Sequence, residues 1–167
     1  MKKFFTVLTA LVCLLPLSGC GAAFGVETKE EAQKHAAFFE QALATQTIQI
    51  EITKVIPAGG VAKMTGGEYV IRIEEGVLTT RLPFIGSGTG VDFFSHDGLS
   101  YVFEKVALDM ATGMREKNYV MQFTADMKGE PVSMDIEMSR SGFATITATS
   151  NRRSAMIYYG NVIFPDE

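Results

Sequence analysis

The chain has 167 residues, of which 47% are hydrophobic, so it is long enough for one domain with its own core. Its net charge of −4 does not favour nucleic acid or anionic lipid headgroups as partners. Its two cysteines, Cys13 and Cys20, both lie near the amino terminus. The rest of the chain therefore has no disulfide and no thiolate metal site.

The first 19 residues have the layout of a secretory signal peptide. Lys2 and Lys3 form a positively charged start, and an almost wholly apolar run follows over residues 4–17. A permanent transmembrane helix needs about 20 apolar residues, so this run is too short to be one. We expect residues 1–19 to be removed, which takes away both lysines and changes the net charge from −4 to −6.

The four residues that end this segment resemble the bacterial lipobox, in the order Leu17-Ser18-Gly19-Cys20. The resemblance implies cleavage before Cys20, a diacylglycerol on its sulfur and, usually, acylation of the new amino group. Two or three acyl chains hold stably, because each buried methylene contributes about 0.8 kcal/mol and one chain alone binds only marginally. An ordinary signal peptide that ends near a cysteine is the alternative.

These signals divide the chain into a lipoprotein signal peptide (1–19), a lipidated tether (20–27) and a β-rich domain (28–167). The tether lacks the acidic cluster that follows the cysteine in many surface-exposed lipoproteins of the Bacteroidetes. By that resemblance we expect a protein anchored to the outer membrane through Cys20 and facing the periplasm.

The domain begins with a predicted helix over residues 29–44. Thr28 and Glu31 fit a capping box, and apolar or aromatic side chains recur at helical spacing: Ala32, His35, Ala36, Phe39, Ala42 and Leu43. Since the polar face is not strongly basic, we expect the apolar face to pack on the domain. The alternative is an amphipathic helix that lies on the membrane.

After the helix the hydrophobic period changes to two, which predicts β-strands. About eight are expected: 48–53, 69–74, 77–82, 99–109, 118–127, 132–139, 143–149 and 155–164. No helical stretch separates them, so the sheet must be antiparallel. Eight sequential strands favour a barrel or a strongly curled sandwich, with the helix over an open end or edge. The fold class is mainly β, in a single domain.

Glycine, proline and polar residues predict the turns between these strands, at 57–60, 74–76, 112–113, 128–131, 141–142 and 151–153. Gly160 is expected to form a bulge in the last strand. Arg152 and Arg153 are expected to be solvent-exposed residues of a polar turn.

Several short motifs fall in an order that resembles a lipoprotein family of the Bacteroidetes, domain of unknown function 4251. They are Pro57 with Gly59-Gly60, Gly67-Glu68-Tyr69, Glu74-Glu75-Gly76, Leu82-Pro83-Phe84-Ile85-Gly86 and the Tyr159-Gly160 ending that leads to Pro165. The resemblance covers residues 48–165 and implies a β-rich envelope domain. It implies no activity and no functional residues.

Ser95, His96 and Asp97 superficially offer the parts of a hydrolase. Neighbouring side chains of an extended segment point apart, so these three cannot form a relay among themselves. His35 lies on the predicted helix, and the chain has no Gly-x-Ser-x-Gly elbow. We therefore expect His96 to be a solvated loop residue.

The other candidate sites are weak. The glycine loop at 86–90 lacks the lysine of a phosphate-binding loop, and Asp92 and Asp97 match no known calcium loop. Glu74 and Glu75 diverge at a turn. A thioether copper site is an alternative for four strand methionines, but these are expected to fill the core: Met121, Met127, Met134 and Met138.

Two functions remain. The first is a non-catalytic envelope lipoprotein that binds another envelope component or a protein partner, with no cofactor and no nucleic acid. The second is a carrier of a small apolar molecule in a barrel lined by methionine and phenylalanine. A filled interior supports the first, and a cavity of roughly several hundred Å³ supports the second. A hydrolase is the least favoured hypothesis.

Overall fold

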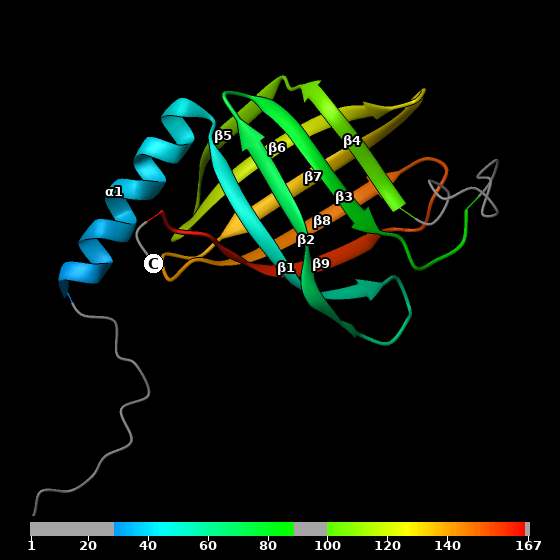
Figure 1. Ribbon diagram of the computed structural model, residues 1–167, viewed down its shortest axis with the longest axis horizontal. Coiled ribbons are helices and arrows are strands. Elements are labelled where there is room, and N and C mark those ends of the chain that lie inside the picture. The colour runs from blue at the N-terminus through cyan, green and yellow to red at the C-terminus, as the bar shows by residue number, and fades with distance from the viewer. Residues whose placement is uncertain (1–28, 89–99, 166–167) are drawn as a thin grey trace, which may run out of the picture.

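The computed structural model describes residues 29–88 and 100–165 as one helix and a single curled half-barrel sheet (Figure 1). The helix is α1 (Lys29–Thr45), which agrees to one residue with the predicted 29–44. The strands are β1 (Ile48–Pro57), β2 (Lys63–Glu74), β3 (Val77–Pro83), β4 (Ser100–Ala107), β5 (Met110–Arg115), β6 (Asn118–Met127), β7 (Glu130–Met138), β8 (Phe143–Ser150) and β9 (Met156–Val162).

The predicted antiparallel, mainly β fold is confirmed. The sheet order is β4-β3-β2-β1-β9-β8-β7-β6-β5, and every pairing is antiparallel. Each pair of consecutive strands is hydrogen-bonded except β4 and β5, and β1 also pairs with β9. The strands therefore form a meander that curls back on itself, with one open seam where β4 and β5 meet in sequence.

The described residues form nine strands where about eight were expected, and the difference arises at this seam. Antiparallel pairing throughout requires β4 and β5, at the two edges, to run in the same direction. Only Leu108 and Asp109 join them, so they are two halves of one bent strand. The first half pairs with β3 and the second with β6. Lys105, with a φ of 54°, lies in β4 next to a register shift against β3, and such a bulge bends a strand.

The predicted turn at Thr112 and Gly113 is wrong. Both residues lie inside β5, where Thr112 pairs with Met121 and Gly113 with Val120. The chain turns instead at Glu116, which has a φ of 57°. Because Gly113 has no positive φ, its presence in the sequence did not mark a turn.

Two other predicted hairpins are confirmed. Glu75 and Gly76 have φ values of 50° and 75°, and Lys128 and Gly129 have φ values of 54° and 82°. Two successive positive φ angles give the twist that matches a tight antiparallel hairpin. The turn at 128–131 is shorter than predicted, because Glu130 already begins β7.

The bulge predicted at Gly160 lies on the opposite strand. The register of β1 against β9 shifts between Ile52 and Lys54, so the extra residue is Thr53 of β1. Gly160 remains in regular pairing with Ile52, and a Cβ there would collide with the carbonyl oxygen of Glu51. Gly160 is therefore needed for close approach of two backbones rather than for a bulge.

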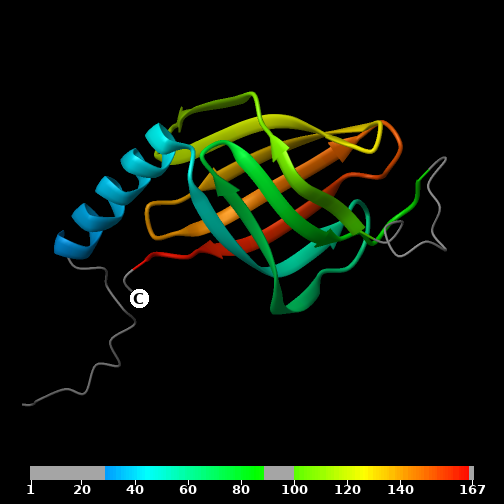
Figure 2. The ribbon, with the colours of Figure 1, turned by 45° about the horizontal axis from the view of Figure 1, so that its top comes forward.

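The concave face of the sheet encloses the core, and α1 closes one end of it (Figure 2). Phe39 of α1 is fully buried and stacks on Tyr119 of β6, with 4.5 Å between ring centroids. Phe164 packs against the same helix, edge-on to Phe38 at 5.0 Å. The apolar helix face thus packs on the domain, as predicted. Thr28, the predicted N-cap, lies outside the described residues.

No helix within residues 29–88 and 100–165 has both the length and the apolar character required to cross a membrane. We call the end of the half-barrel covered by α1 the helix end. The opposite end, where β1 turns into β2, where β6 turns into β7 and where residues 151–155 lead into β9, is called the hairpin end.

Candidate functional site

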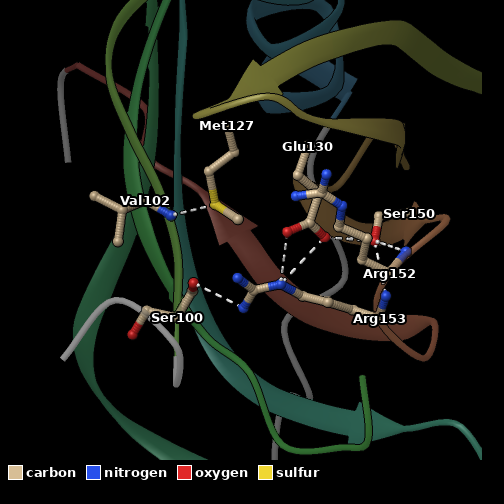
Figure 3. A network of polar contacts seen from close by, with 7 residues as sticks. All are labelled: Ser100, Val102, Met127, Glu130, Ser150, Arg152 and Arg153. Carbon is tan, nitrogen blue, oxygen red and sulfur yellow. Dashed lines mark hydrogen bonds and ion pairs between the residues drawn. The ribbon is translucent and has the colours of Figure 1, made fainter. Parts of the chain in front are cut away.

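The apolar interior contains one buried ion pair, at the hairpin end, among the residues that the structure describes. Arg153 Nε donates to both carboxylate oxygens of Glu130, at 3.2 and 3.1 Å (Figure 3). Each of the two side chains is only 5% exposed. Charged groups are rarely buried this deeply unless they are paired, so this pair is the first candidate for a special role.

Three separate segments position the ion pair. Glu130 is the first residue of β7, and Arg153 lies in the connection between β8 and β9. Ser150 Oγ donates to Glu130 Oε1 at 2.6 Å and accepts the backbone N–H groups of Arg152 and Arg153. Ser150 therefore fixes the turn and the carboxylate together.

The guanidinium group also reaches the edge strand across the seam. Arg153 Nη1 donates to the backbone carbonyl of Ser100, the first residue of β4, at 3.1 Å. A second contact crosses the same seam, where the backbone N–H of Val102 donates to Met127 Sδ of β6 at 3.2 Å (Figure 3). These two contacts fasten the free edge of β4 to the side of the sheet that carries β6 and β7.

Two aromatic rings lie beside the cation. The guanidinium carbon of Arg153 lies 5.2 Å from the centroid of Phe84 and 5.1 Å from that of Tyr101. These two rings meet edge to face at 5.7 Å. A cation over aromatic faces is favourable, and more so when water is excluded, so the rings partly offset the loss of hydration.

Two buried tyrosines complete the cluster. Tyr158 Oη donates to the carbonyl of Pro83 at 2.9 Å, whereas Tyr101 Oη is the single buried side-chain polar atom in the described residues without a hydrogen-bond partner. Burial raises the pKa of Tyr101 to about 12, against the lowering effect of Arg153 and with a further rise from Glu130. Burial likewise raises the pKa of Tyr158, and Tyr101 adds to the rise. Both phenols are therefore neutral near neutral pH.

The contacts of this cluster engage each of its charged groups. The Glu130 carboxylate is held by Arg153 and Ser150, and burial keeps both tyrosines protonated. Within the described ranges, no group of three or more His, Cys, Asp or Glu residues could hold a metal ion. The ion pair closes the hairpin end and fastens the seam.

The expected exposure of Arg152 and Arg153 was correct only for the first. Arg152 is exposed, but Arg153 is buried in the ion pair. One sequence signal could have found its partner: Glu130 occupies the same alternation as Val132, Met134 and Ile136, all of which face the core. An acidic residue on an inward position requires a buried partner, although the sequence does not say which one.

The remaining predicted residues are scattered. The four strand methionines are all buried in the core, as expected: Met121, Met127, Met134 and Met138. Glu74 and Glu75 lie exposed at the hairpin between β2 and β3. His35, the one described histidine, stacks on Phe164 with 4.0 Å between centroids. The structure does not describe Cys20, Asp92, Ser95, His96 or Asp97, and of the glycine loop it describes only residues 86–88.

Three hollows on the described surface lie outside the core. One of about 770 Å³ lies over the polar outer face of β6, β7 and β8, and one of about 490 Å³ lies over β2 and β3. A third, of about 590 Å³, lies between α1 and the segment around Phe164. Apolar side chains fill the concave side of the sheet from α1 to the ion pair.

Comparisons with known proteins agree on the fold. The sequence profile of a family described as Domain of unknown function (DUF4251) matches residues 30–162. The crystal structure of a DUF4251 family protein from Bacteroides eggerthii DSM 20697 superposes with a TM-score of 0.56 and 17% sequence identity, over 78% of this chain and 87% of that chain. At this identity the likeness shows a shared fold alone. The comparison with curated proteins finds no match.

Proposed function

The chain belongs to the family described as Domain of unknown function (DUF4251), and from this premise we propose that it is a lipid-anchored, non-catalytic binding or structural module of the cell envelope. The observation that carries the proposal is the interior of the half-barrel. It is filled by apolar side chains, and its charged residues are engaged with each other. Binding is then a property of the outer surface.

The sequence supports the anchor. Leu17-Ser18-Gly19-Cys20 ends an apolar run with a positive start, and the helix of the domain begins at Lys29, nine residues after Cys20. The proposed attachment is to the outer membrane, through acyl chains on Cys20, with the domain in the periplasm. The proposed partner is an envelope protein. An acidic chain does not favour nucleic acid.

Metabolic labelling tests the anchor. Cells fed labelled palmitate should incorporate it into the protein, and Cys20→Ala should abolish the label and release the chain from the membrane fraction. Cys13→Ala is the matched control, because this cysteine lies in the predicted signal peptide and its loss should leave the labelling unchanged. An unlabelled protein with Cys20 intact would refute the proposal.

One observation favours the second function, a carrier of a small apolar ligand. Across the seam the backbone N–H of Val102 meets a methionine sulfur, which is a weaker acceptor than a carbonyl oxygen. Parting of β4 from β6 there would open a core rich in methionine. Met127→Ala removes this contact across the seam, so it should increase the uptake of a fluorescent fatty acid relative to the unmodified protein. Absence of uptake by both the variant and the unmodified protein would exclude the carrier.

A further inference from the structure

Exposed apolar side chains of the described residues gather at both ends of the half-barrel. Val61 and Met64, at the hairpin end, are 82% and 76% exposed. Phe143 and Ile163, at the helix end, are 46% and 42% exposed, and Met114 of the edge strand β5 is 55% exposed at the same end. Scattered exposed apolar residues are common on soluble proteins, so the question is whether one group has a reason to be there.

Phe143 and Ile163 lie on the outer face of β8 and β9 and just beyond the end of β9. Phe143 stacks on Tyr159, with 5.7 Å between centroids and 24° between the ring planes. The ammonium nitrogen of Lys54 lies over the Tyr159 ring, 4.7 Å from the ring centroid. Ile163 follows β9 directly, and Phe143 pairs with Asn161 two residues before it. We call Arg140, Phe143, Tyr159 and Ile163 the docking surface.

The turn that carries this surface is tightly held. Ser139 N–H donates to the Phe143 carbonyl at 2.8 Å, and Phe143 N–H donates to Ser139 Oγ at 3.1 Å. Gly142 N–H donates to the Ser139 carbonyl at 3.0 Å. Arg140 is exposed at the tip of this turn. Aromatic and aliphatic side chains are thus presented beside a cation on a fixed backbone, which lowers the entropic cost of binding.

The surface lies where the amino-terminal tether enters the domain. Gly142 faces the ring of Phe164, and Phe164 stacks on His35 of α1. His35 is six residues from the start of α1, which is about 9 Å along a helix. The tether from Cys20 to Lys29 spans at most roughly 30 Å when fully extended. A lipid on Cys20 therefore keeps the helix end close to the bilayer.

The hairpin end lies farther from the point where the tether enters the domain. The ten residues of β1 separate the two ends by about 33 Å. The apolar face of α1 is itself unavailable to lipid, because Phe39 is fully buried against Tyr119. The exposed apolar residues of the helix end, which include the docking surface, are therefore the ones that the tether brings nearest to the membrane.

We propose that the docking surface, formed by Arg140, Phe143, Tyr159 and Ile163, inserts into the headgroup region of the bilayer to which Cys20 is anchored. This inference rests on the proposed anchoring. Phe143 and Ile163 enter the boundary between headgroups and acyl chains, and Arg140 binds lipid phosphate. The tether makes this weak contact effective, because it keeps the local lipid concentration high.

The chain contains no tryptophan, so a single introduced tryptophan is a site-specific reporter. The full lipidated protein, with Phe143→Trp, would be reconstituted in vesicles of phosphatidylethanolamine and phosphatidylglycerol that contain a shallow doxyl-labelled lipid. We expect it to lose roughly half or more of its fluorescence, since an interfacial side chain lies about 5–10 Å deep and within reach of the quencher. Ile163→Trp is a second reporter in case the first fails to fold.

Met64→Trp is the matched control, because Met64 is more exposed than Phe143 but lies at the hairpin end. Its fluorescence should be unchanged by the quencher. A protein that floats with the vesicles while its helix-end tryptophans stay unquenched would overturn the docking and leave the anchor standing, and would favour a protein partner for this surface. Equal quenching at both ends would also overturn it. A protein that fails to float would refute both the anchor and the docking.

Discussion

The two ends of the half-barrel are closed in different ways. At the helix end, Phe39 of α1 stacks on Tyr119, and the closure is apolar. At the hairpin end, Arg153 and Glu130 form a buried ion pair, and the rings of Phe84 and Tyr101 lie beside the guanidinium group. Burial of apolar side chains is favourable in free energy, whereas a buried ion pair must first offset the free-energy cost of removing two charges from water. The first closure stabilises the fold directly, and the second holds the strands in one arrangement while being costly to break.

Loss of one ion-pair partner should have the largest effect. Glu130→Ala leaves the Arg153 guanidinium buried without its counterion, which we expect to lower the free energy of unfolding by about 3–5 kcal/mol. Urea denaturation measures this loss. Arg115→Ala is the surface control, because Arg115 pairs with Asp135 and Glu137 where water screens the charges, and it should change stability little.

A double variant sharpens this test. Glu130→Leu combined with Arg153→Met replaces the pair with apolar side chains and should recover most of the stability, because no charge is then buried alone. If the double variant were as unstable as Glu130→Ala, the ion pair would be a net source of stability and the contrast between the two ends would be wrong.

Alkaline pH should weaken the hairpin end. The Tyr101 phenol has a pKa of about 12 in the folded protein and near 10 when unfolded. Between these values the unfolded state has released a proton that the folded state still holds, so stability falls as pH rises, by up to about 1.4 kcal/mol per pH unit from this group. Below pH 10 its contribution is constant. Urea midpoints measured across pH 9–12 should fall less steeply in Tyr101→Phe than in the unmodified protein. Identical slopes in the two proteins would contradict the assignment of this pH dependence to Tyr101.

The two tyrosines of the hairpin end should respond in opposite ways at neutral pH. Tyr158→Phe removes the donor to the Pro83 carbonyl and should cost about 1–3 kcal/mol of unfolding free energy. Tyr101→Phe removes a buried hydroxyl without a partner, so it should be neutral or stabilising. Thermal and urea denaturation of these two tyrosine variants measure the difference. A destabilised Tyr101→Phe would show that this hydroxyl has a partner after all.

The helix end should respond most mildly to a conservative change. Phe39→Leu keeps an apolar side chain but removes the ring stacking on Tyr119, and the loss of stacking should cost about 0.5–1.5 kcal/mol. Gln41→Ala, an exposed change on the same helix, is the control and should have no measurable effect on the urea midpoint. A larger loss in the control than in Phe39→Leu would contradict the packing described here.

The same contrast explains what the sequence could predict. Helix spacing around Phe39 and the alternation from Val132 to Met138 are local patterns, and both located the buried faces correctly. The ion pair joins residues 23 positions apart, and each partner stands beside a turn, where polar residues are common. Arg153 therefore looked like a surface residue. The bend between β4 and β5 could not be predicted for a similar reason. It arises because β4 pairs with β3 and β5 with β6, and the sequence of one strand does not show which strand it pairs with.

Native mass spectrometry of the protein isolated from its membrane tests the central claim most directly, which is that a lipid anchors a domain with a sealed interior. We predict a polypeptide that begins at Cys20, carries the added mass of its acyl chains and retains no other small molecule. A chain without acyl mass, or a second bound molecule released only on unfolding, would contradict the account.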